Sequence, residues 1–516
     1  MERQLSRHRR PLGLGHSPIT WAPAWICSSL LVAYSALVGT SCLEGQSNSA
    51  SVVAFGAVPD GILRTDGAMT AGSTLLTSPS SGFTAADVGK YIQVIGAGAG
   101  STSNTDGAMS DGSPVLTSSS GIFASSDVGR GIVVIGAGPS GGNLVTSIQT
   151  YSAPDSVTLS AAASTSVAGA TYYYGAMTLE GTVQGVQNGT TISLSLPALA
   201  TISGATFAYG TDNHTAFQAA IDAAGQAGGG VVSVPAPSSC PSDAICGYVL
   251  TVTDQMTAQA PGAVKIRYNN ISLTGDAPQT NLFCRGAFGT YTNTVAFPGL
   301  TGNIRGNCLA IGDNGGPNGA AGEAVSSIAI SNLHLYGMTN GNTYKVNFGS
   351  PHQSPTGDEW DTTHKAIYMW VSSSFSNITI DSVIIQDYKA ENIYSGGSVV
   401  TGMVIENSTL TNFNGDGISI LAACLQVLNN TISNGSNAAV EDSTASSGGA
   451  ALVGQLYQGN TISRFPKEGI VVVGVDDGVA SGTVQITNNA FDTIGQINGN
   501  GSLQTAISIH CCPEQS

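Results

Sequence analysis

The sequence predicts an all-β protein: a right-handed parallel β-helix with an N-terminal capping α-helix and an inserted, internally duplicated small β-module. Three observations support this prediction. Short apolar units recur from residue 324 onward, residues 215–225 have helical spacing, and residues 62–206 contain duplications. The chain has 516 residues, 67 of them glycine, and only 9% are charged, which is typical of a turn-rich globular protein with a large core.

The first 41 residues have the pattern of a signal peptide. Four arginines precede an apolar run at residues 26–38, and the small residues Gly-Thr-Ser follow it. This run is too short to span a membrane comfortably. Arg10, which follows another arginine, and Cys42 raise twin-arginine and lipoprotein export as alternatives. Gly39, however, is not the large aliphatic residue that a lipobox requires, so we expect a secreted, periplasmic or cell-surface protein.

Without this leader the chain has 12 basic and 31 acidic residues, a formal net charge of −19. Such a charge repels nucleic acid and anionic membranes, so neither is expected as a partner. In an oxidising compartment, Cys240 and Cys246 are close enough in a proline-containing loop to form a disulfide. Cys284 and Cys308 are a second candidate pair.

Residues 52–61, VVAFGAVPDG, are predicted to form a short strand that runs into a turn. A suitable continuation, TDNHTAFQAAIDAAGQAGGGVVSVP, begins only at Thr211. It contains a predicted helix with Asp212 or Asn213 as its cap, a stop of three glycines, and a strand that ends in proline. The first half of the motif is therefore separated from the second by the module at residues 62–206.

The inserted module repeats itself twice. Residues 65–98 match residues 105–138 at 21 of 34 positions, and residues 157–175 match residues 192–210 at a spacing of 35. Alternating apolar residues and Gly/Ser turns predict short strands. The module has no cluster of histidine, cysteine or paired carboxylates, so a structural insert is favoured over a binding or assembly surface.

From residue 207 to residue 516 we expect the β-helix. Units of 22 to 30 residues are too short to bury their own apolar faces, and one 50-residue step indicates a rung that carries an insertion. Asn407, Asn429 and Asn488 are expected to stack their amides at the turns. The predicted first anchors of the units are Ile330, Ile380, Ile405, Val427, Tyr457 and Ile486.

The order of strand, FGAxxDG turn, Asp-x-x-Thr-Ala helix, glycine-rich turn and strand resembles the start of the pectate lyase superfamily, in particular its rhamnogalacturonase and epimerase-like branch. The resemblance covers residues 52–61 and 211–516, which is 316 of 516 residues. It implies the β-helix and its capping helix, and says little about the reaction. GDGISI at residues 415–420 looks like the Gly-His-Gly segment of polygalacturonase-like members, with Asp416 in place of the histidine. The other motifs of those enzymes are missing, so a true polygalacturonase is not expected.

A column of acidic residues is the first candidate site. Each unit has a second predicted strand, and the residue two places before its first apolar residue forms one column along the stack. Four successive units place Glu391, Asp416, Ala438 and Glu468 in this column, and the units on either side add Lys365 and Thr505. Strands about 4.8 Å apart would place Glu391 and Asp416 roughly 5 Å apart, and Asp416 and Glu468 about 10 Å apart. We predict these acids and Lys365 as catalytic, with Asp416 and Glu468 favoured as an inverting pair. A lyase would instead use Lys365 or Lys389 as its base. The alternative is a row of exposed acids beside turn glycines.

The inserted rung is the second candidate site. It offers Trp360 as an aromatic platform, with Asp361 and His364 beside it, and Lys389 joins the predicted substrate-binding set. A solvated loop with one packed tryptophan is the alternative. The sequence predicts no cofactor and no metal, and leaves calcium open.

The predicted function is that of an exported, carbohydrate-active β-helix protein that cleaves a polysaccharide, either as a glycoside hydrolase or as a lyase. The alternative is a non-catalytic surface protein that binds carbohydrate, as an adhesin does. The oligomeric state stays open.

Overall fold

The computed structural model describes residues 49–98, 102–128, 131–141, 144–175, 178–198, 201–251, 264–285, 307–312, 324–338, 364–369, 374–388, 390–395, 400–413, 415–435, 437–442, 454–465, 468–475, 483–494 and 506–511. Among these residues no helix is both long enough and apolar enough to cross a membrane.

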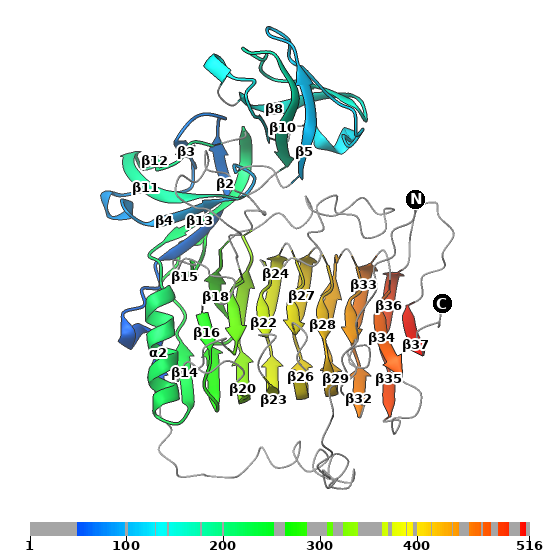
Figure 1. Cartoon of the computed structure of the whole chain (residues 1–516). Helices are drawn as coiled ribbons and strands as arrows, with labels where there is room; N and C mark the ends of the chain where they lie inside the picture. The colour runs from blue at the N-terminus through cyan, green and yellow to red at the C-terminus, as the bar shows by residue number, and fades with distance from the viewer. Residues whose placement is uncertain are drawn as a thin grey trace, which may run out of the picture. The chain divides into compact units, whose positions relative to one another are not determined.

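Three parallel sheets stack rung upon rung and form a β-helix (Figure 1). The first sheet contains β1 (Ser49–Ser51), β14 (Gly230–Val234), β17 (Ile271–Gly275), β20 (Val325–Ser331), β23 (Phe375–Asp381), β26 (Val400–Glu406), β29 (Ala422–Leu428), β32 (Gln455–Gln458) and β35 (Val484–Thr487). The second contains β15 (Ile245–Val249), β18 (Thr280–Phe283), β21 (Leu333–Tyr336), β24 (Ile384–Tyr388), β27 (Thr409–Phe413), β30 (Thr431–Ser433), β33 (Thr461–Phe465) and β36 (Ala490–Ile494). The third contains β16 (Val264–Ile266), β19 (Leu309–Ile311), β22 (Ile367–Met369), β25 (Ile393–Ser395), β28 (Ile418–Ile420), β31 (Val440–Asp442), β34 (Ile470–Val475) and β37 (Ile507–Cys511).

The predicted register of the rungs is confirmed. Each predicted first anchor pairs with the next, from Ile330 with Ile380 to Tyr457 with Ile486. In the third sheet, Ile367, Ile393 and Ile418 pair in the same way. These side chains point inward and lie in one continuous apolar core. The core stabilises the stack because a single rung cannot bury its own apolar face.

The asparagine ladder lies one residue later than predicted. Asn429 and Asn488 have positive φ, near 55°, and form left-handed turns. The buried ladder is made by Asn430, Asn460 and Asn489. Asn460 Oδ1 accepts from the backbone N–H of Asn430 at 2.9 Å, and its Nδ2 donates to the carbonyl of Val427 at 2.8 Å. The amides thus satisfy the backbone groups that the turn would otherwise bury unpaired.

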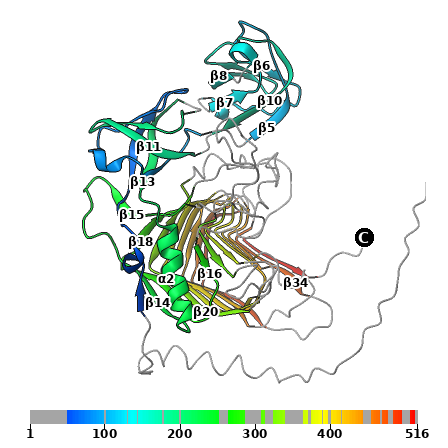
Figure 2. The ribbon, with the colours of Figure 1, turned by 60° about the vertical axis from the view of Figure 1, so that its left-hand side comes forward.

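Helix α2 (His214–Gln226) packs on the first rungs of the β-helix. Its buried side chains, Phe217, Ala220, Ile221 and Ala224, belong to the same apolar core as the sheets. Figure 2 shows α2 lying beside β14 and β16 at this end of the stack. The helix ends where the chain enters three glycines with positive φ, which side chains with a Cβ rarely adopt.

The start of the motif differs from the predicted strand. Residues Val52–Phe55 form the 3-10 helix η1, and the strand is the preceding Ser49–Ser51, which pairs with β14. Val52 is buried while Val53 and Phe55 are exposed. The apolar run is therefore not the buried strand that its composition indicated.

The inserted segment folds as one six-stranded module inside another. The outer copy contains β2 (Gly61–Met69), β3 (Leu75–Thr77), η2 (Ala85–Asp87), β4 (Tyr91–Val94), β11 (Leu179–Asn188), β12 (Thr191–Leu194) and β13 (Ile202–Gly210). The inner copy contains β5 (Thr102–Met109), β6 (Val115–Ser118), η3 (Ser125–Asp127), β7 (Gly131–Val134), η4 (Pro139–Gly141), β8 (Leu144–Ala153), β9 (Ser156–Leu159) and β10 (Val167–Gly175). The inner copy is a closed barrel, and the outer copy pairs its strands in the same order.

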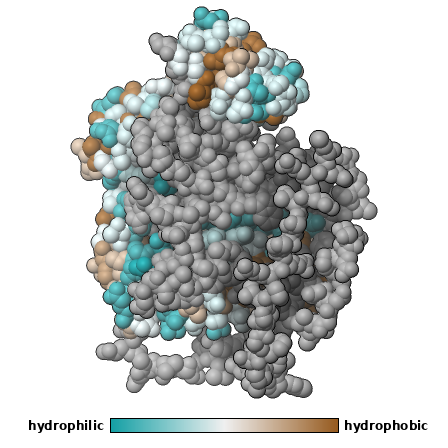
Figure 3. All heavy atoms as spheres, viewed as in Figure 1, coloured by the Kyte–Doolittle hydropathy of each residue, from teal (hydrophilic) through white to brown (hydrophobic). Residues whose placement is uncertain are grey.

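The two duplications in the sequence are therefore the two halves of a single duplication. The matching first halves of the two copies are 40 residues apart and the matching second halves are 35 residues apart, because the inner copy is inserted between the two halves of the outer copy. The two cores correspond residue by residue: Phe83, Phe207 and Tyr209 pack together in the outer copy, as Phe123, Tyr172 and Tyr174 do in the inner one. Figure 3 shows apolar surface on the inner copy. The exposed large hydrophobic residues of this copy include Val115, Val128 and Ile135.

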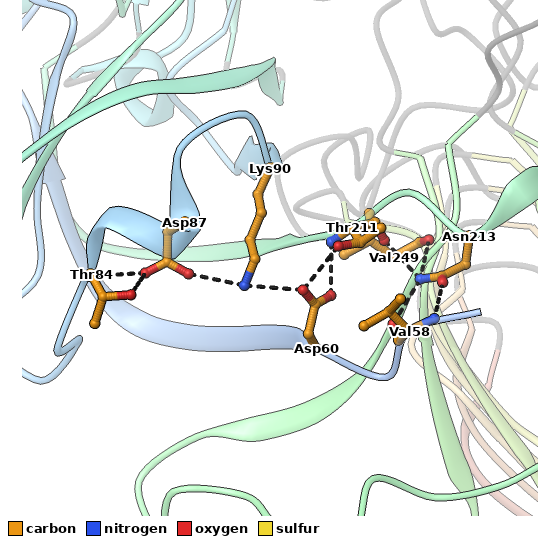
Figure 4. Close-up of polar contacts among 8 residues, drawn as sticks. All are labelled: Val58, Asp60, Thr84, Asp87, Lys90, Thr211, Asn213 and Val249. Atoms are coloured by element: carbon orange, nitrogen blue, oxygen red, sulfur yellow. Dashed lines mark hydrogen bonds and ion pairs between the residues drawn. The ribbon is translucent and has the colours of Figure 1, made fainter. Parts of the chain in front are cut away.

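Each insertion leaves and re-enters its host at nearly one point. A Cβ built on Gly98 would lie 2.5 Å from the carbonyl oxygen of Thr178, and one built on Gly210 would lie 2.7 Å from Cα of Gly61. Figure 4 shows the point where the outer copy joins the β-helix. There, Asp60 accepts from the backbone N–H of Thr211 at 2.8 Å and from its hydroxyl at 2.9 Å.

The same region holds the two halves of the split motif together. Asn213 exchanges two hydrogen bonds with the backbone of Val58, at 2.6 and 3.1 Å. The outer copy is also hydrogen-bonded to the β-helix, because β2 pairs antiparallel with β15.

Candidate functional site

The predicted acidic column is a real stack in the turn that leads into the third sheet. The backbone N–H of Asn392 donates to the carbonyl of Asp416, and that of Ala439 donates to the carbonyl of Glu468. These bonds join neighbouring rungs, so the residues of the column lie one above another along the stack. Thr505 lies outside the described residues.

Lys365, Glu391 and Asp416 are buried, with 0%, 2% and 2% of their surfaces exposed. Glu391 and Asp416 are therefore not the exposed acids of the alternative prediction. The ammonium of Lys365 donates to the carboxylate of Glu391, and the two form a buried ion pair. The backbone N–H of Lys365 donates to Oδ1 of Asn307 at 2.6 Å, which fixes the start of β22.

Two tyrosines of the third sheet lie beside the charged groups. Tyr368 and Tyr394 alternate along their strands with Ile367 and Ile393, which places the tyrosines on the opposite face of the sheet. Tyr368 is buried and Tyr394 is half-buried. The ammonium of Lys365 is 4.2 Å from the ring centroid of Tyr394, close enough for a cation–π contact. The two tyrosine rings stack at 5.9 Å with an interplanar angle of 15°.

Asp416 is the most perturbed of these acids. Burial raises the pKa of its carboxyl well above the usual range, and the negative charges of Glu441 and Glu391 raise it further. A hydrogen bond with Glu441 also raises this pKa, whereas the backbone N–H of Ala438, 2.8 Å from Oδ1, lowers it. Burial and the two carboxylates therefore disfavour the charged form of Asp416.

Glu391 differs from Asp416 because it has a cation beside it. Burial raises the pKa of Glu391, and the ammonium of Lys365 opposes that shift. Burial, and then the charge of Glu391, raise the pKa of Tyr394 to about 12, so that this phenol keeps its proton.

Glu441 is a further acid beside Asp416 that the predicted column does not include. It follows Val440, lies in register with Ser419, and through Ser419 continues the outward column of Tyr394. The signal was present in the sequence, because the repeat alignment fixed Val440 as the first apolar residue of its strand. The predicted column lies two residues before Val440, so it does not include Glu441, which is inside the strand. We name Glu391, Asp416 and Glu441, together with Lys365 and Tyr394, the acidic wall.

Glu468 is half-buried and stacks on the rung after Ala438. The carboxylates that raise the pKa of Asp416 are those of Glu441 and Glu391. The rung between Asp416 and Glu468 supplies the N–H of Ala438 to Asp416. The pairing of Asp416 with Glu468 stays a prediction.

The predicted substrate-binding set is only partly described. Trp360, Asp361 and Lys389 lie outside the described residues. His364 is buried, with its Nε2 2.9 Å from the carbonyl oxygen of Arg285 and its ring 5.1 Å from that of Tyr388. It packs under the surface here and does not present its ring as a platform for a sugar.

The described residues include two disulfides, Cys240–Cys246 and Cys284–Cys308, with Cα–Cα distances of 5.7 and 5.4 Å. Within the described ranges, no group of three or more His, Cys, Asp or Glu residues is arranged to hold a metal ion.

The chain matches no protein-family model and no curated protein. Among solved structures, it is similar to the A-module of mannuronan C-5 epimerase AlgE6 from Azotobacter vinelandii. That match has 14% identity and a TM-score of 0.25, and covers 59% of this chain and 96% of the module.

A second similar structure is the tailspike protein of E. coli bacteriophage HK620 in complex with a pentasaccharide. It has 14% identity and a TM-score of 0.23, over 59% of this chain and 60% of the tailspike. This chain thus spans about 60% of the tailspike's length. Likenesses this weak carry no argument about the reaction. The rhamnogalacturonase and epimerase-like branch stays a prediction.

Proposed function

We propose that the protein is an exported enzyme that cleaves a polysaccharide, that the acidic wall is its active site, and that glycoside hydrolysis is its reaction. One observation carries the proposal. The carboxyl of Asp416 is buried, with 2% of the residue's surface exposed, and lies beside the carboxylates of Glu441 and Glu391, which raise its pKa and so favour its protonated form. A proton on such a group is what the departing oxygen of a glycosidic bond needs at neutral pH.

The roles follow from the contacts of each residue. Asp416 is the general acid. Glu441 is the favoured carboxylate partner, because it already shares a hydrogen bond with Asp416 and is only half-buried. This bond holds the two groups closer than the roughly 5 to 9.5 Å between the catalytic carboxyls of glycosidases. The sugar therefore has to separate them as it enters, and Glu468 is the second candidate for the partner role.

A lyase is less well supported. It needs a base that takes a proton from the carbon next to a uronate carboxylate. Lys365 donates to Glu391 and is fully buried, so it acts as a charge partner. The pKa of Tyr394, raised to about 12, also makes its phenol a poor base at neutral pH.

A binding protein without catalysis is the second candidate, and the burial of the wall favours it. Lys365, Glu391 and Asp416 together expose almost no surface. A buried ion pair with a neutral acid beside it also occurs as a purely structural cluster. In that case the half-buried Tyr394 would contact the glycan and no bond would be broken.

The test is an assay with a panel of neutral and acidic polysaccharides, read both by new reducing ends and by the ultraviolet absorbance of unsaturated products. We expect reducing ends without that absorbance, and we expect Asp416→Asn to lower turnover by at least about 100-fold. Asp492→Asn, at an exposed carboxylate on the second sheet, is the matched control and should keep full activity.

Glu441→Gln and Glu468→Gln then decide which carboxylate is the partner. Unsaturated products would replace the hydrolase by a lyase. Full activity of Asp416→Asn would refute the site. No cleavage of any polysaccharide by the unmodified chain would favour the binding protein.

A further inference from the structure

A second polar site lies where the outer copy meets the β-helix. It is a cavity of about 640 Å³, lined by residues from both parts of the chain. We name it the seam cavity. Its volume lies within the range of roughly 300 to 1,000 Å³ that is typical of ligand sites. It shares no lining residue with the acidic wall, so the inference below does not rest on the proposed function.

The walls contain ion pairs, two of which cross the junction. The ammonium of Lys90, from the outer copy, lies 3.0 Å from Asp60 and 3.0 Å from Asp87 (Figure 4). On another side, the guanidinium of Arg285 donates to Glu180 at 2.9 Å. Tyr91 donates its hydroxyl to the same Glu180 oxygen. These contacts fix the polar groups of the cavity before any ligand enters.

The charges around the cavity disfavour an anionic ligand. Lys90 and Arg285 are the two lining cations, against the lining Asp60 and Asp212 and the paired carboxylates of Asp87 and Glu180. A phosphate or a uronate would therefore meet net negative charge. Among the described residues, no group of three or more His, Cys, Asp or Glu is arranged to hold a metal ion. A neutral ligand that is rich in hydrogen-bonding groups fits these charges best.

The lining also has hydrogen-bonding capacity to offer. An ammonium has three N–H donors, and Lys90 uses two of them for its carboxylates, which leaves the third for a ligand. Asp212 is held by the backbone N–H groups of His214 and Thr251, at 3.2 and 3.0 Å, both on Oδ1. Its Oδ2 receives no hydrogen bond from any other described residue, so it is placed to accept one from a ligand. Hydroxyls and a ring complete the lining, from Thr182, Thr211, Thr251 and Tyr91.

We propose that the seam cavity binds a neutral saccharide. Vicinal hydroxyls can donate to a fixed carboxylate and accept from an ammonium at the same time, and the face of a sugar ring can contact an aromatic ring. The inserted module would thus contribute one half of a glycan-binding site, and the β-helix the other half.

The structure offers a matched pair of variants for the test. Val88 lines the cavity and is 49% exposed, and Val128, its equivalent 40 residues later in the inner copy, is 46% exposed. Both follow a 3-10 helix with nearly the same backbone angles. Val88→Trp should obstruct the cavity, whereas Val128→Trp places the same side chain at a similarly exposed position that does not line it. Thr182→Phe is a second obstructing variant, from strand β11.

Binding of the full chain to an array of neutral and uronic acid oligosaccharides is measured first, and the affinity for the best neutral probe is then measured by calorimetry. We expect Val88→Trp and Thr182→Phe to weaken binding at least tenfold. Val128→Trp and Asp492→Asn, neither of which lies in the seam cavity or the acidic wall, should leave it unchanged. Absence of binding to every neutral probe, binding of uronates alone, or equal loss in Val88→Trp and Val128→Trp would overturn the proposal.

Discussion

Breaking the ion pair between Lys365 and Glu391 should destabilise the β-helix strongly, although replacing both residues should not. The side chains of the pair are 0% and 3% exposed, so neither charge can turn to water when its partner is removed. An uncompensated buried charge costs about 3 to 5 kcal/mol. A double replacement by apolar residues of similar volume is often neutral, because it removes both the charges and their desolvation cost.

The contacts predict which of the two single variants loses more free energy of unfolding. Lys365→Met removes the cation and its contact with Tyr394, and leaves Glu391 facing Asp416, so we expect the upper end of the range. Glu391→Leu leaves an unpaired ammonium, but it also removes one of the two carboxylates that raise the pKa of Asp416, so we expect the lower end.

Urea unfolding of the four proteins in this cycle gives the coupling energy directly. We expect the double variant to lie within about 1 kcal/mol of the parent chain and the coupling to exceed about 2 kcal/mol. If the double variant loses as much free energy of unfolding as the two single variants together, the ion pair is not the organising contact of the acidic wall.

Three further predictions concern the rest of the chain. Deleting residues 99–177 and joining Gly98 to Thr178 should leave a folded protein with nearly the parent melting temperature, because the ends of the inner copy already meet; an aggregated product would show that the inner copy is needed. Asn460→Ala should lower the free energy of unfolding in urea by about 1 to 3 kcal/mol, because it removes the partners of buried backbone groups. Asn407→Gly, at an exposed position with φ of 51°, should lower it by less than about 0.5 kcal/mol. Equal losses in the two variants would contradict the ladder. The pKa of Asp416 is higher in the folded chain than in the unfolded chain, so the folded state binds the extra proton and stability should fall as the pH rises above about 4, up to the folded pKa. Asp416→Asn should lose this slope, and parallel curves for the two proteins between pH 4 and 8 would contradict the raised pKa.

Much of the β-helix could be predicted from sequence because the spacing of the repeat determines which residues of neighbouring rungs pair. Inward positions such as Ile380 and Ile405 recur because each rung buries the same column, so the spacing carries the pairing. The shift of the ladder from Asn429 to Asn430 shows the limit. Both residues of the pair are asparagine, and only the backbone decides which one turns and which one stacks.

The site was harder to predict because its chemistry depends on burial. The column correctly located Glu391 and Asp416 in the turn, but composition alone could not show that they are buried or that Lys365 neutralises only one of them. The nesting of the two copies was also hidden. Two spacings, 40 and 35, look like two tandem events until the strand order shows one module inside the other.

The state of the Asp416 carboxyl tests the central claim most directly. Difference infrared spectroscopy between the parent chain and Asp416→Asn, recorded from pH 4 to 8, isolates the carbonyl stretch of that one group. We expect a protonated carboxyl signal that persists at pH 7, because burial and the charges of Glu441 and Glu391 oppose ionisation. A signal that disappears near pH 4, as for an ordinary aspartate, would contradict the assignment of Asp416 as the general acid.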